Sequence, residues 1–539
     1  MLILFSIIVA LLLLLDFVKK RPLGRASCAI PTLHPCYPLL GNSLLLLGKS
    51  EQRRFESLAD VYRKTSRVQK CWLGPQLLYA VAHPDLVQKI LTDPNCCEKP
   101  FFYDFVNLKH GLFSAKYKLW KPYRKSLNST FNAKILLSFI AIFEKCARDM
   151  VVKMRPYSHG SPVDILQFTS ECTLEMVCRT TLGTEALERK EKAEFLNNLR
   201  ILFSKVATRV ISVELYSDTI YKLTSGYYEE KRTRKYCLNY AYQIIAERQS
   251  SLRLQSSSTD SEDGYEDRTP KIFIDQVLSM ATSDETEFNV QNLSEQILTI
   301  IAAGHDTSSQ MVAHTCLFLA MFPELQEQIA VEIQTLLPSG EAEISPEILQ
   351  QMTALDKFLK ESMRLAPVGP IIARTNMVDI ELDGAHIPQG NIFLFNFYTL
   401  HRRKDFWGPD ANRFDPKNFT SERTKKRHPF AYLPFSGGSR NCIGARYAMY
   451  STKIMLVYVV RNFRLSTDIK FENLRYLLDI TLNLAFEHLV RLEQVVLMLV
   501  VKRSYVHVSF EFYEISAVYV LFHTEKIGIS GAQLTFTSQ

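Results

Sequence analysis

The sequence predicts a mostly α-helical (α+β) fold, with one large helical domain, a small β region and a preceding N-terminal membrane anchor. Three observations support this. Most segments between about Glu51 and Arg248 repeat apolar residues at the spacing of one helix face. Segments rich in β-branched and aromatic residues come late in the chain, after Asp379. Long helices followed by a few strands indicate one α+β domain.

The N-terminal segment Met1–Val18 is apolar apart from one Asp, and the basic residues Lys19–Arg21 follow it directly. A signal peptide carries its positive charges before the apolar run, whereas an anchor with a cytoplasmic domain carries them after it. The order favours an uncleaved anchor just long enough to cross a bilayer. The sequence ASC at 26–28 leaves a cleaved signal peptide as the alternative.

Composition divides the chain into four parts: a transmembrane anchor (1–18), a basic and proline-rich linker (19–42), the main domain (43–493) and a C-terminal extension of unknown role (494–539). Prolines make Ile30–Asn42 a poor helix candidate. The extension starts with the apolar VVLMLVV. Both a natural extension and sequence read beyond the end of the gene fit it.

Within the domain, apolar spacing predicts helices over Ile135–Met154 and Val163–Leu182. The Ser-rich, acidic stretch Ser250–Thr269 predicts a solvated loop. A long helix is then expected to begin at a capping box formed by Asn292 and Glu295. Later elements are expected as strands at Asp379–Leu382 and Asn391–Tyr398 around a Gly384 turn, a helix at Ala445–Val460 and closing strands within Phe471–Glu493.

Charge and cysteine usage exclude some classes of protein. The net charge of +8 is modest for 539 residues, and no basic stripe is interleaved with aromatic residues, so no nucleic-acid partner is expected. The eleven cysteines are scattered and contain no CxxC pair. This favours a reducing compartment over a disulfide scaffold or a zinc site.

The strongest chemical signal is a glycine-containing loop with the pattern Phe435-x-x-Gly438-x-Arg440-x-Cys442-x-Gly444. Glycines allow turns barred to other residues and a close approach to a flat cofactor. A cysteine just before a helix start meets the positive end of the helix dipole, which is expected to lower its pKa. A lone cysteine in such a turn would be a buried structural residue. The full pattern indicates a metal-binding thiolate.

This loop resembles the haem-binding signature of the cytochrome P450 superfamily, and the resemblance extends over roughly Pro31–Glu493. It implies a P450-like fold and heme b held non-covalently apart from a Cys442 thiolate–iron bond. It also implies a microsomal monooxygenase in the endoplasmic reticulum membrane. The segments Trp407–Phe419 and Cys442–Met449 are similar to the family-four clan, especially its insect members.

Two further motifs fit this resemblance. The segment Ala303–Ser308 (AGHDTS) resembles the family's oxygen-activation motif, in which Asp306 and Thr307 would be catalytic and deliver protons to dioxygen. An exposed polar helix face is the alternative for these residues. Glu361 and Arg364 lie one helical turn apart, and the resemblance makes them a buried structural pair.

The resemblance also implies a clamp for the haem propionates. Trp120 and Arg124 match the family's WxxxR pattern, and Arg374 and Arg440 hold corresponding positions. Cationic donors suit carboxylates because they form charge-assisted hydrogen bonds. Taken singly, each arginine would be a surface residue with its stem packed on apolar neighbours.

The sequence departs from its relatives at two positions. Ala303 stands where many family-four hydroxylases carry a Glu esterified to haem, so no ester link is expected here. Asn418 stands where the superfamily has an Arg that braces Glu361 and Arg364, and His401 is a candidate substitute donor.

The expected activity is insertion of one oxygen atom from O₂ into a hydrophobic small molecule (a lipid, hormone-like molecule or xenobiotic). No flavin or nicotinamide motif is present, so electrons should come from NADPH through NADPH–cytochrome P450 reductase, with cytochrome b5 as a second candidate donor. A basic cluster could steer the reductase, and a solvated charge run is its alternative. Its members are Arg423, Lys425, Lys426, Arg427 and Arg446.

Apolar composition predicts the substrate walls at Phe101–Leu112, Leu202–Tyr228, Ala302–Thr307, Ala366–Ile372 and Ala485–Glu487. Two other functions fit the same loop. A haem-thiolate isomerase or dehydratase would act without a reductase, although the Asp306-Thr307 pair argues against it. A non-catalytic haem-binding protein is the third candidate.

Overall fold

The computed structural model describes residues 2–183, 191–258, 272–281, 289–338 and 343–495. In chain order its α-helices are α1 (Leu2–Ala26), α2 (Glu51–Lys64), α3 (Pro84–Thr92), α4 (Tyr117–Leu127), α5 (Ala133–Ser138), α6 (Ile140–Met154), α7 (Ile165–Leu182), α8 (Lys192–Ile211), α9 (Asp218–Lys222), α10 (Ser225–Ser258), α11 (Phe273–Ala281), α12 (Val290–Met321), α13 (Pro323–Leu336), α14 (Pro346–Gln351), α15 (Thr353–Leu365), α16 (Phe397–Leu400), α17 (Lys404–Trp407), α18 (Ser421–Lys426) and α19 (Ala445–Asn462). The strands are β1 (Val68–Leu73), β2 (Gln76–Val81), β3 (Val163–Asp164), β4 (Ile371–Thr375), β5 (Ile380–Leu382), β6 (Ala385–Ile387), β7 (Ile392–Asn396), β8 (Phe463–Ser466), β9 (Tyr476–Leu478), β10 (Leu482–Leu484) and β11 (Leu489–Gln494). The fold is mostly helical with a small β region, as predicted.

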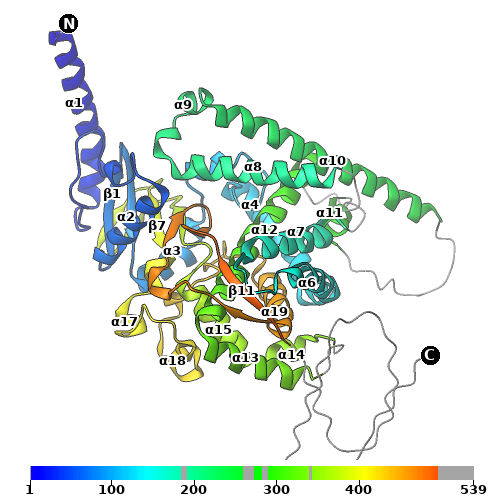
Figure 1. Ribbon diagram of the computed structural model, residues 1–539. Coiled ribbons are helices and arrows are strands. Elements are labelled where there is room, and N and C mark those ends of the chain that lie inside the picture. The colour runs from blue at the N-terminus through cyan, green and yellow to red at the C-terminus, as the bar shows by residue number, and fades with distance from the viewer. Residues whose placement is uncertain (1, 184–190, 259–271, 282–288, 339–342, 496–539) are drawn as a thin grey trace, which may run out of the picture. The chain divides into compact units, whose positions relative to one another are not determined.

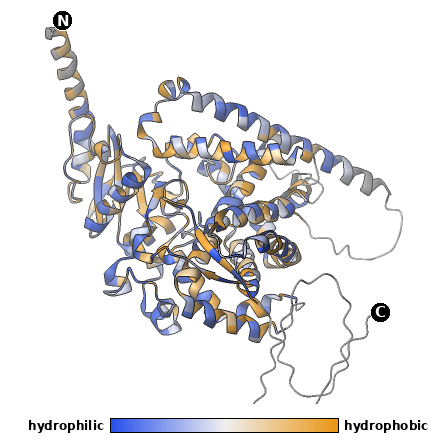
Figure 2. Ribbon diagram, viewed as in Figure 1, coloured by the Kyte–Doolittle hydropathy of each residue, from blue (hydrophilic) through white to orange (hydrophobic). Residues whose placement is uncertain are grey.

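Helix α12 runs through the helical part of the domain, between α7 and α10 on one side and α15 and α19 on the other (Figure 1). The largest apolar core is shared by α6, α12, α15 and α19, and a second core joins α7, α8, α10 and α12. Figure 2 shows why α10 lies at the outside: most of its length is hydrophilic. A helix packed on several sides is buried over most of its surface, which suits α12 to position side chains inside the domain.

The predicted start of α12 is wrong by three residues. Asn289 is the N-cap, and its side chain accepts a hydrogen bond from the N–H of Asn292. Glu295 does not close a capping box but accepts from the N–H of His110 (2.7 Å). A distant loop therefore binds the carboxylate that the local pattern assigned to the cap.

Three other element boundaries differ from prediction. Helix α10 continues to Ser258, so the first part of the predicted loop at Ser250–Thr269 is helical, and its remainder from 259 lies outside the described residues. The predicted strand Asn391–Tyr398 ends at Asn396, whose side chain caps the short helix α16. The helix expected from Val163 begins at Ile165, because Val163 and Asp164 pair with β11 instead. The helix predicted at Ala445–Val460 is confirmed as α19.

The main sheet has the order β1-β2-β7-β4 and lies beside α2 (Figure 1). Strand β7 pairs in parallel with β2 and antiparallel with β4, which joins chain segments about three hundred residues apart. A second sheet has the order β3-β11-β8, and β9 and β10 form a hairpin. The closing strands predicted within Phe471–Glu493 are confirmed, and their hairpin positions polar residues against α12.

The predicted membrane anchor is not supported as a spanning segment. Among the described residues, no helix combines the length and the apolar content needed to cross a bilayer. Helix α1 does not end at Val18 but continues to Ala26, through the basic residues and Pro22. Lys20 pairs with Asp16 one turn earlier, so charged residues are integrated in this helix. The predicted extension at 494–539 lies outside the described residues from 496 onward.

Candidate active site

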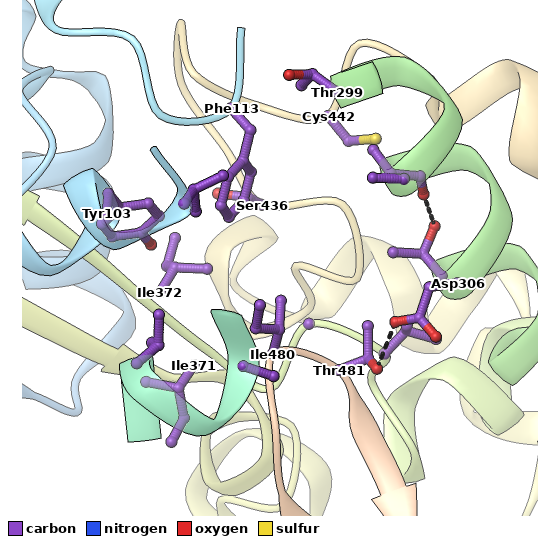
Figure 3. Close-up of a pocket in the computed structure, with 18 of the residues that line it drawn as sticks. Tyr103, Phe113, Thr299, Asp306, Ile371, Ile372, Ser436, Cys442, Ile480 and Thr481 are labelled. Atoms are coloured by element: carbon purple, nitrogen blue, oxygen red, sulfur yellow. Dashed lines mark hydrogen bonds between the residues drawn. The ribbon is translucent and has the colours of Figure 1, made fainter. Parts of the chain in front are cut away.

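A cavity of about 820 Å³ is lined by α12, the loop before α19, β4 and the turn between β9 and β10 (Figure 3). Its wall is mainly apolar, with residues such as Phe113, Ile371 and Ile372. The Cys442 side chain also faces this cavity, and Asp306 lines it from α12. The structure therefore brings together segments that are more than a hundred residues apart in sequence.

The backbone of the cysteine loop is fixed by local hydrogen bonding and one close contact. The N–H of Cys442 donates to the carbonyl of Phe435 (2.9 Å). Gly438 has φ +72°, and a Cβ atom there would lie 1.7 Å from the carbonyl oxygen of Leu91. Only glycine fits this position, which explains part of the pattern. Helix α19 begins three residues after the cysteine, with Gly444 as its N-cap.

The pKa of Cys442 does not follow the sequence-based expectation. Burial raises the pKa of the thiol, while the N–H of Gly444 and the charge of Arg124 act in the opposite direction without outweighing it. A coordinated metal ion deprotonates a thiol outright, so bound iron would favour the thiolate at this position.

Cationic side chains gather at one end of the cavity. Arg374 and Arg440 are both buried, and Arg440 lies over the ring of Trp120 (4.3 Å to its centroid). Their hydrogen bonds go to backbone carbonyls: Arg374 donates to Ala373 and Arg440 donates to Ala115. Nε and Nη1 of Arg440 have no partner among the described residues. Buried guanidinium groups without a carboxylate require an anion.

Lys99 belongs to the same group, although the sequence did not single it out. Its ammonium is buried over the ring of Tyr103 (4.0 Å). Burial, together with the charges of Arg374 and Arg440, holds the pKa of Lys99 well below its usual range, and Glu98 only partly offsets this. No motif surrounds Lys99 in sequence, so only the fold could reveal that it joins the cluster.

Arg124 occupies a different position from the other arginines. It is half-buried and donates to both the backbone carbonyl and the side-chain oxygen of Asn441 (2.7 Å each). It thus fixes the residue next to Cys442 and places a positive charge near the thiol. Trp120 and Arg124 both line the cavity, as does each other predicted cofactor contact except Gly438.

These residues fit a haem. A thiol facing a mostly apolar cavity matches the flat, apolar macrocycle with its iron. The buried Arg374 and Arg440, the latter with two unpartnered nitrogens among the described residues, match its two carboxylates. Cys442 would hold the iron, and Trp120, Arg374 and Arg440 would face the propionates. Ala303 lines the cavity with a methyl group, so its side chain offers no carboxylate for an ester.

On the α12 side of the cavity, Asp306 and Thr307 lie on adjacent positions of the helix. The Thr307 hydroxyl donates to the carbonyl of Ala303, within the helix. The Asp306 carboxylate accepts from the Thr481 hydroxyl at 2.8 Å (Figure 3). Burial raises the pKa of Asp306, and the bond from Thr481 only partly offsets this. The predicted alternative of an exposed polar face does not describe these residues, because both line the cavity.

The Glu361–Arg364 pair is buried, as the resemblance implies. Arg364 binds both carboxylate oxygens of Glu361 at 2.7 Å and lies over the Trp407 ring (4.7 Å). Its remaining N–H groups donate to the backbone carbonyls of His401, Ala411 and Arg413. One side chain therefore ties α15 to the loop that precedes α18.

The third member of this brace differs from the expectation. The His401 side chain does not donate to Glu361, since its Nε2 accepts from the N–H of Leu433 (2.8 Å). Asn418 itself donates to Glu361 (3.1 Å), as does the N–H of Asp415 (2.7 Å). Arg427 stacks on Trp407 (3.6 Å) and donates to the carbonyl of Asn418. Asn418, supported by Arg427, thus takes the place of the arginine that the resemblance leads one to expect at position 418.

The cavity wall agrees with most of the predicted ranges. Residues from Phe102–Leu112, Phe203–Tyr216, Ala302–Thr307 and Val368–Ile372 line it. The predicted turn at Ala485–Glu487 does not, since the hairpin instead presents Asp479, Ile480 and Thr481. Sequence analysis missed these three residues because hairpin register, not composition, decides which turn faces inward.

Comparison with known proteins agrees with this geometry. The family profile described as Cytochrome P450 matches residues 31–477. The chain is 31% identical to "Probable cytochrome P450 313a4" of Drosophila melanogaster, over 85% of this chain and 92% of that protein. It is 29% identical to "Cytochrome P450 4c21" of Blattella germanica, over 88% and 95%, and 27% identical to mouse "Cytochrome P450 4V2", over 86% and 88%. The chain therefore belongs to the cytochrome P450 family, as a haem-thiolate monooxygenase that binds heme b.

Proposed function

We propose that this enzyme inserts one atom of dioxygen into a hydrophobic small molecule, using electrons that NADPH supplies through a reductase. One observation carries the proposal: a single cavity contains the Cys442 thiol, the Asp306 carboxyl and a mainly apolar wall. An apolar wall favours a lipid-like or other hydrophobic substrate. The match covers 92% and 95% of the two insect relatives named above, so the proposal concerns an enzyme of the same extent as theirs.

The roles of the side chains follow from their positions. Cys442 would hold the haem iron through its sulfur, and the bound haem would supply dioxygen activation. Asp306 is suited to hold a proton at the cavity, because burial raises the pKa of its carboxyl. Thr307 presents a hydroxyl beside it. Trp120, Arg374 and Arg440 would orient the cofactor through its carboxylates, while apolar residues exclude water from the substrate.

The first experiment tests ligation. The reduced, carbon-monoxide-bound wild-type enzyme should show the red-shifted Soret band of thiolate ligation, and Cys442→Ala should abolish it. Cys97→Ser is a matched control, because Cys97 contacts Ser439 of the same loop (3.0 Å) without lining the cavity. A retained band in Cys442→Ala would contradict the proposed ligand.

The second experiment tests the reaction. Wild-type enzyme with NADPH, P450 reductase and a panel of lipophilic compounds should consume NADPH and form a hydroxylated product. Peroxide rearrangement without reductase would instead identify an isomerase or dehydratase. Addition of cytochrome b5 should raise product formation per NADPH if that protein is a second donor.

Three of the five residues of the basic cluster have a partner in the protein. Arg427 is stacked on Trp407, Arg423 pairs with Asp415, and Lys426 pairs with Glu422. Lys425 and Arg446 are exposed. We expect these two to steer an acidic reductase, so Lys425→Glu with Arg446→Glu should slow reductase-driven turnover and weaken its salt dependence. Unchanged turnover and salt dependence would refute this docking site.

We also propose attachment to the endoplasmic reticulum membrane through α1. Its side chains Leu4, Phe5 and Leu15 are each more than 60% exposed, which is unusual for large apolar residues. Substituting these three residues with Ser should shift the full-length enzyme from the membrane fraction to the supernatant after a carbonate wash. An unchanged distribution would show that α1 does not hold the protein there.

A further inference from the structure

A row of polar residues extends from the cavity along one face of α12. Asp306, Gln310 and His314 are spaced four residues apart and therefore share that face. Each meets a partner from the segment between Thr481 and His488, which includes β10. Asp306 accepts from Thr481, Gln310 donates to Asn483, and the rings of His314 and His488 lie 5.0 Å apart. The polar row thus joins three turns of α12 to the β9–β10 hairpin and the residue before β11.

Several atoms of this polar row have no partner among the described residues. They are Oε1 of Gln310 and both ring nitrogens of His314 and of His488. All three side chains are at least 96% buried. Buried polar atoms are nearly always hydrogen-bonded, to water where protein does not reach them. Five unpaired atoms in one row indicate that water completes it.

Asp479 is the second carboxyl in this region. It lies in the turn between β9 and β10 and lines the cavity with Thr481. Its side chain accepts from the N–H of Ile480 (2.6 Å) and from Nδ2 of Asn483 (3.2 Å), which connects it to Gln310. Burial and the neighbouring charge of Asp306 raise the pKa of Asp479 to about 6. This carboxyl therefore binds a proton far more readily than an ordinary aspartate.

We propose that Asp479 is a positioning residue that holds a proton and passes it to Asp306 across the cavity that both residues line, beside the Thr481 hydroxyl that binds Asp306. This inference rests on the proposed monooxygenase function, because that reaction consumes protons at Asp306. The step is balanced: one proton leaves the Asp479 carboxyl and arrives on the Asp306 carboxylate, without electron transfer. Asp479 then regains a proton from water.

The ionisable groups around Asp479 and Asp306 favour a protonated Asp479. Glu51, at the start of α2, is the other carboxylate that raises the Asp479 pKa, so it disfavours ionisation further. Burial holds the pKa of His488 at about 4 and that of His314 well below its usual range, so both rings are neutral near pH 7. Neutral imidazoles both donate and accept, which suits them to order water without trapping the proton.

The experiment compares holoenzyme variants. Asp479→Asn keeps the shape of the side chain and one acceptor oxygen but cannot carry the proton, and Asp479→Glu restores the carboxyl. Asp468→Asn is the matched control, since Asp468 is an exposed carboxylate paired with Arg491 near the same strands. Thr481→Val and Thr481→Ser test the connecting hydroxyl in the same way.

Two measurements are expected to respond. Infrared pH titration of the resting ferric enzyme should show a protonated carboxyl that titrates near pH 6 in wild type and is lost in Asp479→Asn. Product formed per NADPH should fall roughly tenfold, less than the 10²–10⁴ of a direct general acid, with more hydrogen peroxide released. Its pH profile should lose the limb that wild type shows near pH 6. Asp479→Glu should recover both signals. Thr481→Val should lower product formed per NADPH while keeping the infrared band, Thr481→Ser should recover that yield, and Asp468→Asn should change neither signal.

The proposal is overturned if Asp479→Asn retains the titrating infrared band, or if its pH profile superimposes on that of wild type. Failure of the proposed function gives a different result. In that case wild type would consume no NADPH with any substrate, while the infrared titration, which needs no turnover, would still test the proton-holding carboxyl.

Discussion

Two polar clusters in this domain differ in how completely their hydrogen bonds are satisfied. In the Glu361–Arg364 brace, the guanidinium binds both carboxylate oxygens and three backbone carbonyls, and both side chains are fully buried. In the polar row between α12 and the β9–β10 hairpin, Gln310, His314 and His488 leave five buried atoms without a partner in the part of the chain that the structure describes.

The difference in hydrogen bonding indicates different roles for the two clusters. A fully satisfied ion pair holds a single geometry, because any movement would leave a buried charge unpaired. A row that depends on water can exchange partners at small cost, as proton movement requires. The brace therefore suits a structural role, whereas the row suits a role in the reaction.

The largest expected effect comes from breaking the brace. Arg364→Ala leaves the Glu361 carboxylate buried without its guanidinium and should lower the free energy of unfolding by about 3–5 kcal/mol. Chemical denaturation measures this change. Arg413→Ala is the control, since that side chain is 80% exposed and lies close to the brace, and it should cost under about 1 kcal/mol. Equal losses in the two variants would contradict a structural role for the brace.

An intermediate effect is expected in the cysteine loop. Gly438→Ala combines a positive φ with a Cβ placed 1.7 Å from the Leu91 carbonyl, so it should cost roughly 2–4 kcal/mol and weaken haem retention. Gly390→Ala has a similar φ of +84° in open space and isolates the backbone contribution, about 1–2 kcal/mol. Similar losses in both would show that the loop tolerates the clash.

The smallest effect is expected for Asp479, beside the polar row. The pKa of Asp479 is raised in the folded state, from 3.8 to about 6, so its favourable contribution is complete below about pH 4 and is lost as pH rises through 6. Asp479→Asn should therefore gain stability relative to wild type between pH 4 and 8, by at most about 3 kcal/mol.

Thermal unfolding across this pH range measures the gain. Asp468→Asn should behave in the opposite way, because Arg491 lowers the pKa of Asp468, and its stabilising contribution is lost as pH falls. A parallel pH dependence of Asp479→Asn and wild type would contradict the raised pKa.

The sequence predicted residues whose role depends on short, ordered motifs. Cys442, Arg440, Trp120, Arg374, Asp306 and Thr307 all line one cavity, as expected from the pattern. It failed where partners come from distant segments. His401 was expected to replace the missing arginine, but Asn418 reaches Glu361 and the His401 ring is engaged by Leu433. The expectation of a lowered Cys442 pKa was also wrong, because a local sequence pattern does not show the burial that raises this pKa.

The sequence by itself determined the fold class, the family and most of the residues that line the cavity expected to hold haem, since apolar periodicity and short motifs express local constraints. Only the tertiary structure decided which side chains meet across elements. Three of these side chains belong to no sequence motif: Lys99, which lies near Arg374, Thr481, which binds Asp306, and Asp479, whose pKa Asp306 raises. Their burial and their unpaired atoms arise from packing between segments far apart in the chain, and those two properties set the electrostatics of the site.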